Sequence, residues 1–292
     1  MIFIQLLIIG IMWGLLYALI GNGLNIIYGV MGILNIAHGD LLMIGAYLSF
    51  WMFHLWGINP FWALPLSMVL LFLVGIIIQF LIVNPITKAN PSRVAVENAT
   101  LIAFFGVLFL LENLALLWFS ADYRSVSYLT NSISLFNVSI SLNKIVVMAV
   151  SLLLNILLIL WISKTWTGKA IRAITQDREK GILIGINQQY LGYLTFGIGS
   201  ALCGAAGVLA SLLFVITPTM GFPFLIKAFT VVIIGGMGNI FGVFVAGLVL
   251  GVSEAIGGYF IGEAYKEAID YIILLPIIYL TAKGYIFKGR SA

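Results

Sequence analysis

The sequence predicts an all-α polytopic membrane protein with one transmembrane domain over residues 1–292. Hydrophobic residues make up 62% of the chain and charged residues only 8%, against about 45–50% and about 25% in an average soluble domain. The apolar residues also gather into stretches of the length that crosses a bilayer, about 20 residues. A soluble fold would have too few charges for its surface, so lipid must solvate the excess. Disordered, nucleic-acid-binding and disulfide-rich secreted proteins are excluded.

Eight or nine transmembrane helices are expected. The seventh apolar stretch is short and interrupted by glycine, which predicts a half-helix or a re-entrant segment. The stretches cover residues 3–28, 39–56, 61–83, 100–119, 145–163, 191–216, 222–237, 240–258 and 266–283.

Basic residues predict the sidedness of the connections. Residues 84–98, 164–190 and 283–292 hold 10 of the 14 Lys and Arg residues, and basic connections remain in the cytoplasm. Residues 120–144 and 258–267 are poorer in basic residues and are expected outside. Nine helices threaded through these connections put the N-terminus outside and the C-terminus inside.

Two glycine-rich segments suggest an internal repeat. Residues 29–32 (GVMG) follow the first stretch, and residues 235–238 (GGMG) end the seventh. Each lies where an inward span meets an outward one, which predicts a parallel repeat of the kind found in transporters. The alternative is chance recurrence in a chain with 31 glycines.

Residues 35–40 (NIAHGD) are the first polar segment of interest, and Asn35, His38, Gly39 and Asp40 are candidate pathway or gate residues. Broken backbone at membrane depth is tolerated where it lines a cavity. There its N–H groups can receive a carboxylate, and Asp40 can receive an ammonium. The alternative is that His38 and Asp40 cap a helix at the cytoplasmic interface, because Asp is favoured in a first turn. The residues by themselves favour this capping interpretation.

Three other ionisable residues, Glu112, Lys227 and Glu254, fall within apolar stretches. Such residues are energetically costly, so each is a functional candidate, and Glu112 and Glu254 join the pathway or gate set. Pairing with a neighbouring helix is the alternative for the two acids, and it is favoured over substrate contact. Lys227 is expected to extend its side chain to the outer interface.

Residues 164–190 form a second segment of interest. Gly181 and Gly185 are expected to interrupt or end short helices here. A short helix with an apolar face and charged flanks is suited to dock in a groove of a partner protein. A solvated or membrane-surface loop is the alternative. The apolar residues that alternate with the charges are Ile171, Ile174, Ile182 and Ile186.

Glycines mark the expected helix breaks. A discontinuous helix is predicted near the seventh stretch, and tight packing without a pore role is the alternative. The helix-break glycines are Gly32, Gly235, Gly236, Gly238 and Gly242.

Common catalytic motifs are absent from the sequence. It has no G-x-x-x-x-G-K-[ST] for nucleotide phosphates and no H-E-x-x-H for zinc. With only two histidines, His38 and His54, an enzyme is disfavoured.

Three ordered blocks together resemble the LivH-type permease of high-affinity branched-chain amino-acid ABC transporters. The first block runs over residues 14–40, and the third runs over residues 227–242 and continues to Gly251 and Glu254. The second resembles the cytoplasmic coupling loop of that family, with Arg172, Ala173, Asp177, Gly185, Ile186 and Asn187.

The resemblance implies one half of a heteromeric pore in a bacterial or archaeal cytoplasmic membrane. A LivM-type permease would be its partner, two ATP-binding subunits would dock inside, and a substrate-binding protein would deliver solute outside. No cofactor is expected on this chain, since ATP and Mg would bind to the partner subunits.

Four positions depart from the family pattern. Family members usually have Phe at Ile36, often Glu at Asp40, an acidic residue at Gln176 and Ala at Gly181. Glycine lowers helix propensity by about 1 kcal/mol, but the docking face would remain.

The function expected from this resemblance is ATP-driven import of Leu, Ile and Val. A permease for urea, short amides or another small polar solute is an alternative. A stand-alone secondary carrier or channel is the alternative from another class.

Overall fold

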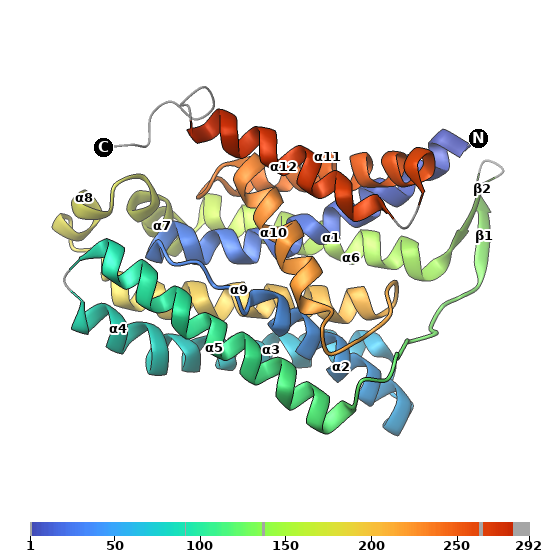
Figure 1. Ribbon diagram of the computed structural model, residues 1–292, viewed down its shortest axis with the longest axis horizontal. Helices are drawn as coiled ribbons and strands as arrows, with labels where there is room; N and C mark the ends of the chain where they lie inside the picture. The colour runs from blue at the N-terminus through green and yellow to red at the C-terminus, as the bar shows by residue number, and fades with distance from the viewer. Residues whose placement is uncertain (1, 91, 136–137, 263–264, 283–292) are drawn as a thin grey trace.

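A computed structural model describes residues 2–90, 92–135, 138–262 and 265–282 of the chain. The helices form an elongated bundle (Figure 1), with the N-terminus and a β-hairpin at one end and α7 and α8 at the other. These are called the hairpin end and the α7 end below.

The regular secondary structure of the described residues is helical except for one hairpin, which the sequence did not predict. The antiparallel strands are β1 (Ser132–Leu135) and β2 (Val138–Ser141). The helices are α1 (Ile2–Met31), α2 (His38–Trp56), α3 (Pro60–Ile78), the π-helix η1 (Gln79–Val83), α4 (Asn84–Ala89), α5 (Arg93–Phe119), α6 (Leu142–Lys164), α7 (Trp166–Gln176), α8 (Arg178–Leu183), α9 (Gln188–Ser211), α10 (Gly221–Gly235), α11 (Ile240–Ile261) and α12 (Lys266–Ala282).

Within the described residues, six helices are long and apolar enough to cross a membrane. They are α1, the continuous run Pro60–Ala89, α5, α6, α9 and α11, and two shorter apolar helices lie at Gly221–Gly235 and Ala268–Tyr279. Helices suit this environment because they satisfy their own backbone hydrogen bonds in lipid. The prediction of an all-α polytopic membrane protein is therefore confirmed.

Helix α1 lies at the centre of the bundle and packs against α6, α9, α10 and α11. Its crossing with α11 depends on glycine, because a Cβ on Gly251 would overlap the backbone of Gly10 and Gly14. Small residues at such crossings allow close helix packing within membranes. The outer helix α5, by contrast, exposes large apolar side chains such as Ile102 and Leu117, as expected of a lipid-facing surface.

Two helices begin halfway along the bundle (Figure 1). After α1 reaches the α7 end, residues 32–37 return without helix to the middle, where α2 starts toward the hairpin end. After α9 reaches the hairpin end, residues 212–220 return to the middle, where α10 starts toward the α7 end.

The directions of the helices bear on the predicted repeat. Helices α1 and α9 run in opposite directions, and each is followed by a returning segment and a helix that begins in the middle of the bundle. Opposed halves of this kind occur in the inverted repeats of transporters. The predicted parallel repeat would pair α1 with α10, which both run toward the α7 end, and it stays a prediction.

The predicted grouping of connections is confirmed. Helix α4 and the start of α5 lie with α7 and α8 at one end of the bundle, while the β-hairpin, the end of α11 and the start of α12 lie at the other (Figure 1). The basic tail, residues 283–292, lies outside the described residues.

Candidate functional site

The N-termini of the two broken helices meet in the middle of the bundle. A Cβ added to Gly39 of α2 would overlap the carbonyl oxygen of Gly221 at the start of α10. A Cβ added to Gly221 would overlap the Oδ1 of Asp40. Glycine is therefore required on both sides of this contact. Residues 35–40 and Gly221 are called the junction below.

Asp40 is a buried carboxylate between two helix N-termini. It lies in the first turn of α2, and only 1% of its surface is exposed. Neither carboxylate oxygen has a hydrogen-bond partner among the described residues. A buried charge without such partners is costly, and the positive ends of the α2 and α10 dipoles offset part of that cost.

Other polar groups of the junction are also incompletely paired. Asn35 is fully buried, and neither atom of its side-chain amide has a partner within the described chain. His38 Nε2 lies 3.2 Å from the carbonyl oxygen of Ile20. The thiol of Cys203 on α9 donates to the carbonyl oxygen of His38 at 2.9 Å.

These positions contradict the part of the capping interpretation that places the segment at the cytoplasmic interface, although Asp40 does lie in the first turn of α2, as that interpretation expects. The N-cap residue of α2 is Ala37, which makes no side-chain cap hydrogen bond, and His38 is completely buried. The segment lies in the bundle interior because the backbone of residues 32–37 returns to the middle. Glu112, another acid of the candidate set, is partly exposed on α5.

Glu254 belongs to a second buried cluster. Lys227 Nζ of α10 lies 2.6 Å from Glu254 Oε1 of α11 and 2.7 Å from Asp270 Oδ2 of α12. The three residues are exposed by only 5%, 1% and 2%. Lys227 also lies 5.0 Å from the centre of the Tyr17 ring. The cluster is called the ion triad below.

The ion triad corrects one expectation and reveals one residue that the sequence reasoning missed. Lys227 does not extend to an interface, because the two carboxylates hold it inside the bundle. The alternative given for Glu254, pairing with a neighbouring helix, is what the structure contains. Asp270 was missed, although it is an acid within the last apolar stretch and met the criterion applied to the others.

The helix breaks fall at the predicted glycines. Gly32 ends α1 with φ 66°, while Gly236 and Gly238 follow α10 with φ 85° and 83°. Gly235 and Gly242 abut across the break. The break is anchored to α1, because the backbone N–H of Gly238 donates to Asn25 Oδ1 at 2.6 Å.

The segment 164–190 folds as two short helices at the α7 end. Ile171 and Ile174 of α7 are buried against the protein, so the prediction that they form a docking face is wrong. The exposed apolar surface lies instead at the end of α8, at Ile182, Leu183 and Ile184, and Leu183 is 84% exposed.

Asp177 organises the turn between α7 and α8. Its Oδ1 accepts from the backbone N–H of Lys180 at 3.0 Å, and its Oδ2 lies 2.8 Å from Lys180 Nζ. The hydrogen bond from the Lys180 side chain lowers the pKa of Asp177, and the same contact raises the pKa of Lys180.

The remaining residues of this segment have local roles. Gly185 follows α8 with φ 86°, and Asn187 caps α9 by accepting from the N–H of Tyr190. Arg172 is exposed, and its guanidinium lies 3.4 Å from the carbonyl oxygen of Ser163. A Cβ on Gly181 would lie 2.9 Å from Ile174 Cγ1, so packing of α8 on α7 explains this glycine.

Apolar helices that begin halfway through a bundle and meet there are found in many membrane transporters, so the fold is that of a membrane transport permease. In the described residues, no group of three His, Cys, Asp or Glu side chains is placed to hold a metal ion.

Comparison with known proteins identifies the family. A family model described as "Branched-chain amino acid transport system / permease component" matches residues 6–281, so the chain belongs to this family. It is a multi-pass protein of the cytoplasmic membrane.

Three curated relatives cover nearly the whole chain. The high-affinity branched-chain amino acid transport system permease protein BraD of Pseudomonas aeruginosa is 32% identical over 97% of this chain and 95% of its own length. The corresponding protein LivH of Salmonella typhimurium is 32% identical over 97% and 94%. The probable LivH protein of Methanocaldococcus jannaschii is 26% identical over 94% and 89%. No solved structure matches the chain.

Proposed function

We propose that this chain is the translocating subunit of an ATP-driven importer of leucine, isoleucine and valine. The observation that carries the proposal is the family match over residues 6–281, together with relatives of that named function at 32% identity. A junction of broken helices inside the bundle supports it, because transporters place substrate sites at such points.

The α7 end is the cytoplasmic end in this proposal. Lys88, Arg172 and Lys180 lie there, which agrees with the positive-inside rule. The N-terminus is then outside and the C-terminus inside, with nine crossings of the membrane. The broken helices α2 and α10 each complete a crossing with their returning segments, residues 32–37 and 212–220.

The exposed end of α8 is the proposed docking point for the ATP-binding subunits. Its apolar side chains at 182–184 are flanked by charges, as expected of a surface that seats in a partner groove. Motion of α7 would reach α1 through Thr175, which lies against Gly29. The coupling residues Arg172, Ala173, Asp177, Gly185, Ile186 and Asn187 surround this point.

The junction is the proposed gate, and Asn35, His38, Gly39 and Asp40 are its residues. When the contact between Gly39 and Gly221 opens, Asp40 faces the ammonium of an amino acid. The positive ends of α2 and α10 face its carboxylate. ATP and binding protein would each favour one state of the gate through their differential affinity.

The proposed partners complete the importer. A LivM-type permease forms the other half of the pore, and two ATP-binding subunits hold ATP and Mg at the α7 end. A substrate-binding protein docks at the hairpin end.

Co-purification and uptake test this function. The tagged chain, purified from its native membrane, is expected to bring along two ATP-binding subunits and a second permease. The complex in vesicles should import leucine only with ATP and binding protein. A chain that purifies alone and transports along an ion gradient would overturn the proposal, as would uptake of urea but not leucine.

A pair of charge variants tests coupling. Arg172→Glu and Leu183→Glu should leave the protein in the membrane but separate ATP hydrolysis from uptake. Lys88→Glu, an exposed change at the same end, is the matched control. Normal uptake in both coupling variants would contradict the docking assignment.

A further inference from the structure

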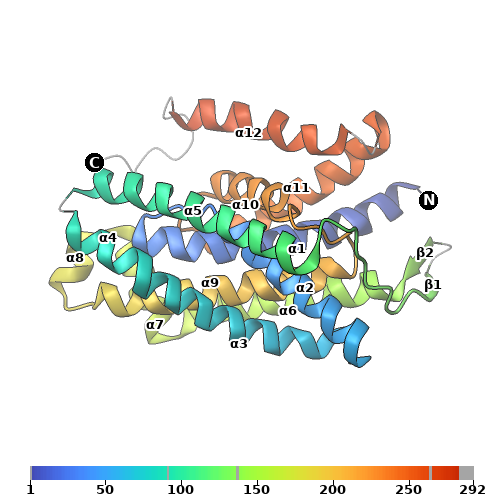
Figure 2. The same ribbon diagram turned by 60° about the horizontal axis from the view of Figure 1, so that its bottom comes forward.

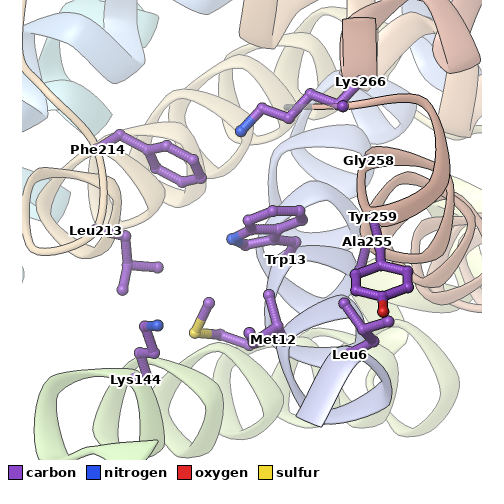
Figure 3. A pocket seen from close by; sticks show the side chains of 12 residues that line it. Leu6, Met12, Trp13, Lys144, Leu213, Phe214, Ala255, Gly258, Tyr259 and Lys266 are labelled. Atoms are coloured by element: carbon purple, nitrogen blue, oxygen red, sulfur yellow. The ribbon is translucent and has the colours of Figure 1, made fainter. Parts of the chain in front are cut away.

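Two cavities lie toward opposite ends of the bundle, which Figure 2 shows from a second side. The larger, about 610 Å³, is at the hairpin end, where Trp13, Phe214 and Lys266 line it (Figure 3). The smaller, about 230 Å³, is at the α7 end, between α1, α6, α7 and the start of α11. Small-molecule sites usually measure about 300–1,000 Å³, so this smaller cavity suits a compact ligand. It is called the α7 cavity below.

One side of the α7 cavity is suited to an anion. Residues 238–241 bring the N-terminus of α11, a helix of 22 residues, to its wall. The positive end of a helix dipole favours negative charge. Arg172 of α7 also lines the cavity, and its guanidinium has one hydrogen-bond contact among the described residues, with the carbonyl oxygen of Ser163 at 3.4 Å. A guanidinium has five N–H donors, so donors remain for a ligand.

The charge of Arg172 is not neutralised by an acid. Arg172 forms no ion pair within the part of the chain that the structure describes. The acid nearest to it in the sequence, Asp177, pairs with Lys180 at 2.8 Å. The residues that line the α7 cavity include no Asp or Glu. Because a guanidinium matches the geometry of a carboxylate, a ligand carboxylate is a suitable partner for Arg172.

A buried amide in the wall of the α7 cavity lacks one partner. Asn25 of α1 lines the cavity and is fully buried. Its Oδ1 accepts from the backbone N–H of Gly238 at 2.6 Å, whereas its Nδ2 has no hydrogen-bond partner among the described residues. A buried donor without a partner is costly, and an oxygen atom of a ligand would remove that cost. This donor points to a ligand independently of the helix dipole.

The remaining wall of the α7 cavity is mostly apolar. It includes Ile26 of α1, Ile159 and Ile162 of α6, and Ile171 of α7. Such a wall favours a ligand with an apolar tail. Since the lining has no carboxylate, the ammonium of an amino acid would lose water there without gaining an ionic partner. The cavity therefore favours a short carboxylic acid that has no amino group.

We propose that the α7 cavity binds a short-chain carboxylate with an apolar tail. The carboxylate takes the free donors of Arg172 and Asn25 at the N-terminus of α11, and the tail lies against the isoleucines. A bound ligand would connect α7 to α1 and α11. Access from the cytoplasm rests on the orientation given under the proposed function, whereas the binding itself does not.

Equilibrium dialysis with radiolabelled isovalerate tests the site, on the protein purified from its native membrane with its bound subunits. Arg172→Gln removes the cation and should weaken binding roughly 10- to 100-fold. Lys169→Gln is the matched control, because it removes an exposed positive charge from the same helix outside the cavity. Asn25→Asp keeps the acceptor for Gly238 but replaces the free donor by an acceptor, so it should also weaken binding, by roughly tenfold or more.

Other ligands test the chemistry of the site. Acetate should bind more weakly than isovalerate, by roughly fourfold for each tail carbon that isovalerate buries. Leucine and the alcohol with the carbon skeleton of isovalerate should each bind roughly tenfold more weakly or less. Inorganic phosphate should not displace isovalerate.

Three results would overturn the site: equal binding by the Arg172→Gln and Lys169→Gln proteins, binding of leucine as tight as that of isovalerate, or displacement of isovalerate by an equal concentration of phosphate. Binding is measured without ATP and without transport. Its failure therefore leaves the proposed importer function unaffected, and a failure of leucine uptake leaves the carboxylate site unaffected.

Discussion

The junction and the ion triad are both buried clusters of charged and polar residues, but they satisfy their charges differently. In the ion triad, Lys227 holds two carboxylates within 2.7 Å and joins three helices. In the junction, Asp40 has no hydrogen-bond partner among the described residues and lies against two helix N-termini. We infer that the two clusters have different roles. The ion triad holds α10, α11 and α12 together, whereas the junction lies where helices can separate.

Removing the central cation of the ion triad, Lys227, is the most direct test of this difference between the two clusters. Lys227→Met leaves Glu254 and Asp270 buried without their shared partner, and losing one member of a buried ion pair costs about 3–5 kcal/mol. We expect a large fall in membrane abundance and in unfolding temperature in detergent. Lys88→Met, an exposed lysine, is the control. A Lys227→Met protein as stable as this control would show that the ion triad does not fasten the helices.

The junction can be tested by adding one methyl group. Gly39→Ala places a Cβ against the Gly221 carbonyl, and overpacking of this kind typically costs about 1–3 kcal/mol. Gly106→Ala on α5 is the matched control, because a Cβ there has no neighbour within 4 Å. Thermal unfolding and leucine uptake are measured for both variants. Equal stability and equal uptake would contradict a tight contact between α2 and α10.

Asp40→Asn tests whether the junction contributes more to transport than to the stability of the fold. Removal of this charge breaks no described hydrogen bond and relieves the cost of burying it, so the loss of stability from the helix dipoles should not exceed about 1 kcal/mol. Uptake should nevertheless fall by roughly tenfold, equivalent to about 1.4 kcal/mol. Loss of abundance that accounts for all of the lost uptake would favour a purely structural role.

Asp177→Asn, which removes the exposed ion pair with Lys180, should give the smallest pH-dependent change in uptake of these variants. The pKa of Asp177 is lowered, so its carboxylate stays charged above the ordinary value of about 3.9. The stabilisation from this pair is present above that pH and is lost only as pH falls through the lowered pKa. The ratio of uptake between the parent and Asp177→Asn should therefore be constant from about pH 6 to 8. A ratio that changes between about pH 6 and 8 would contradict the lowered pKa of Asp177.

The sequence predicted the helices and their grouping at two ends well, because apolar length and charge are local properties. It could not place the junction, since the contact between Gly39 and Gly221 joins positions far apart in the chain. The same limit hid the opposite directions of α1 and α9. Asp270 could have been identified, but its pairing with Lys227 depends on how α12 packs. For Ile171 and Ile174, helical spacing showed an apolar face without showing which way it points.

The position of Cys203 has a practical consequence. It is the only cysteine in the chain and is fully buried, with its thiol held against the first turn of α2. A thiol reagent can therefore reach it only when the helices around it part. The rate of alkylation at this one sulfur, measured with and without ATP turnover, would report how often the helices around it separate. The measurement needs no engineered label.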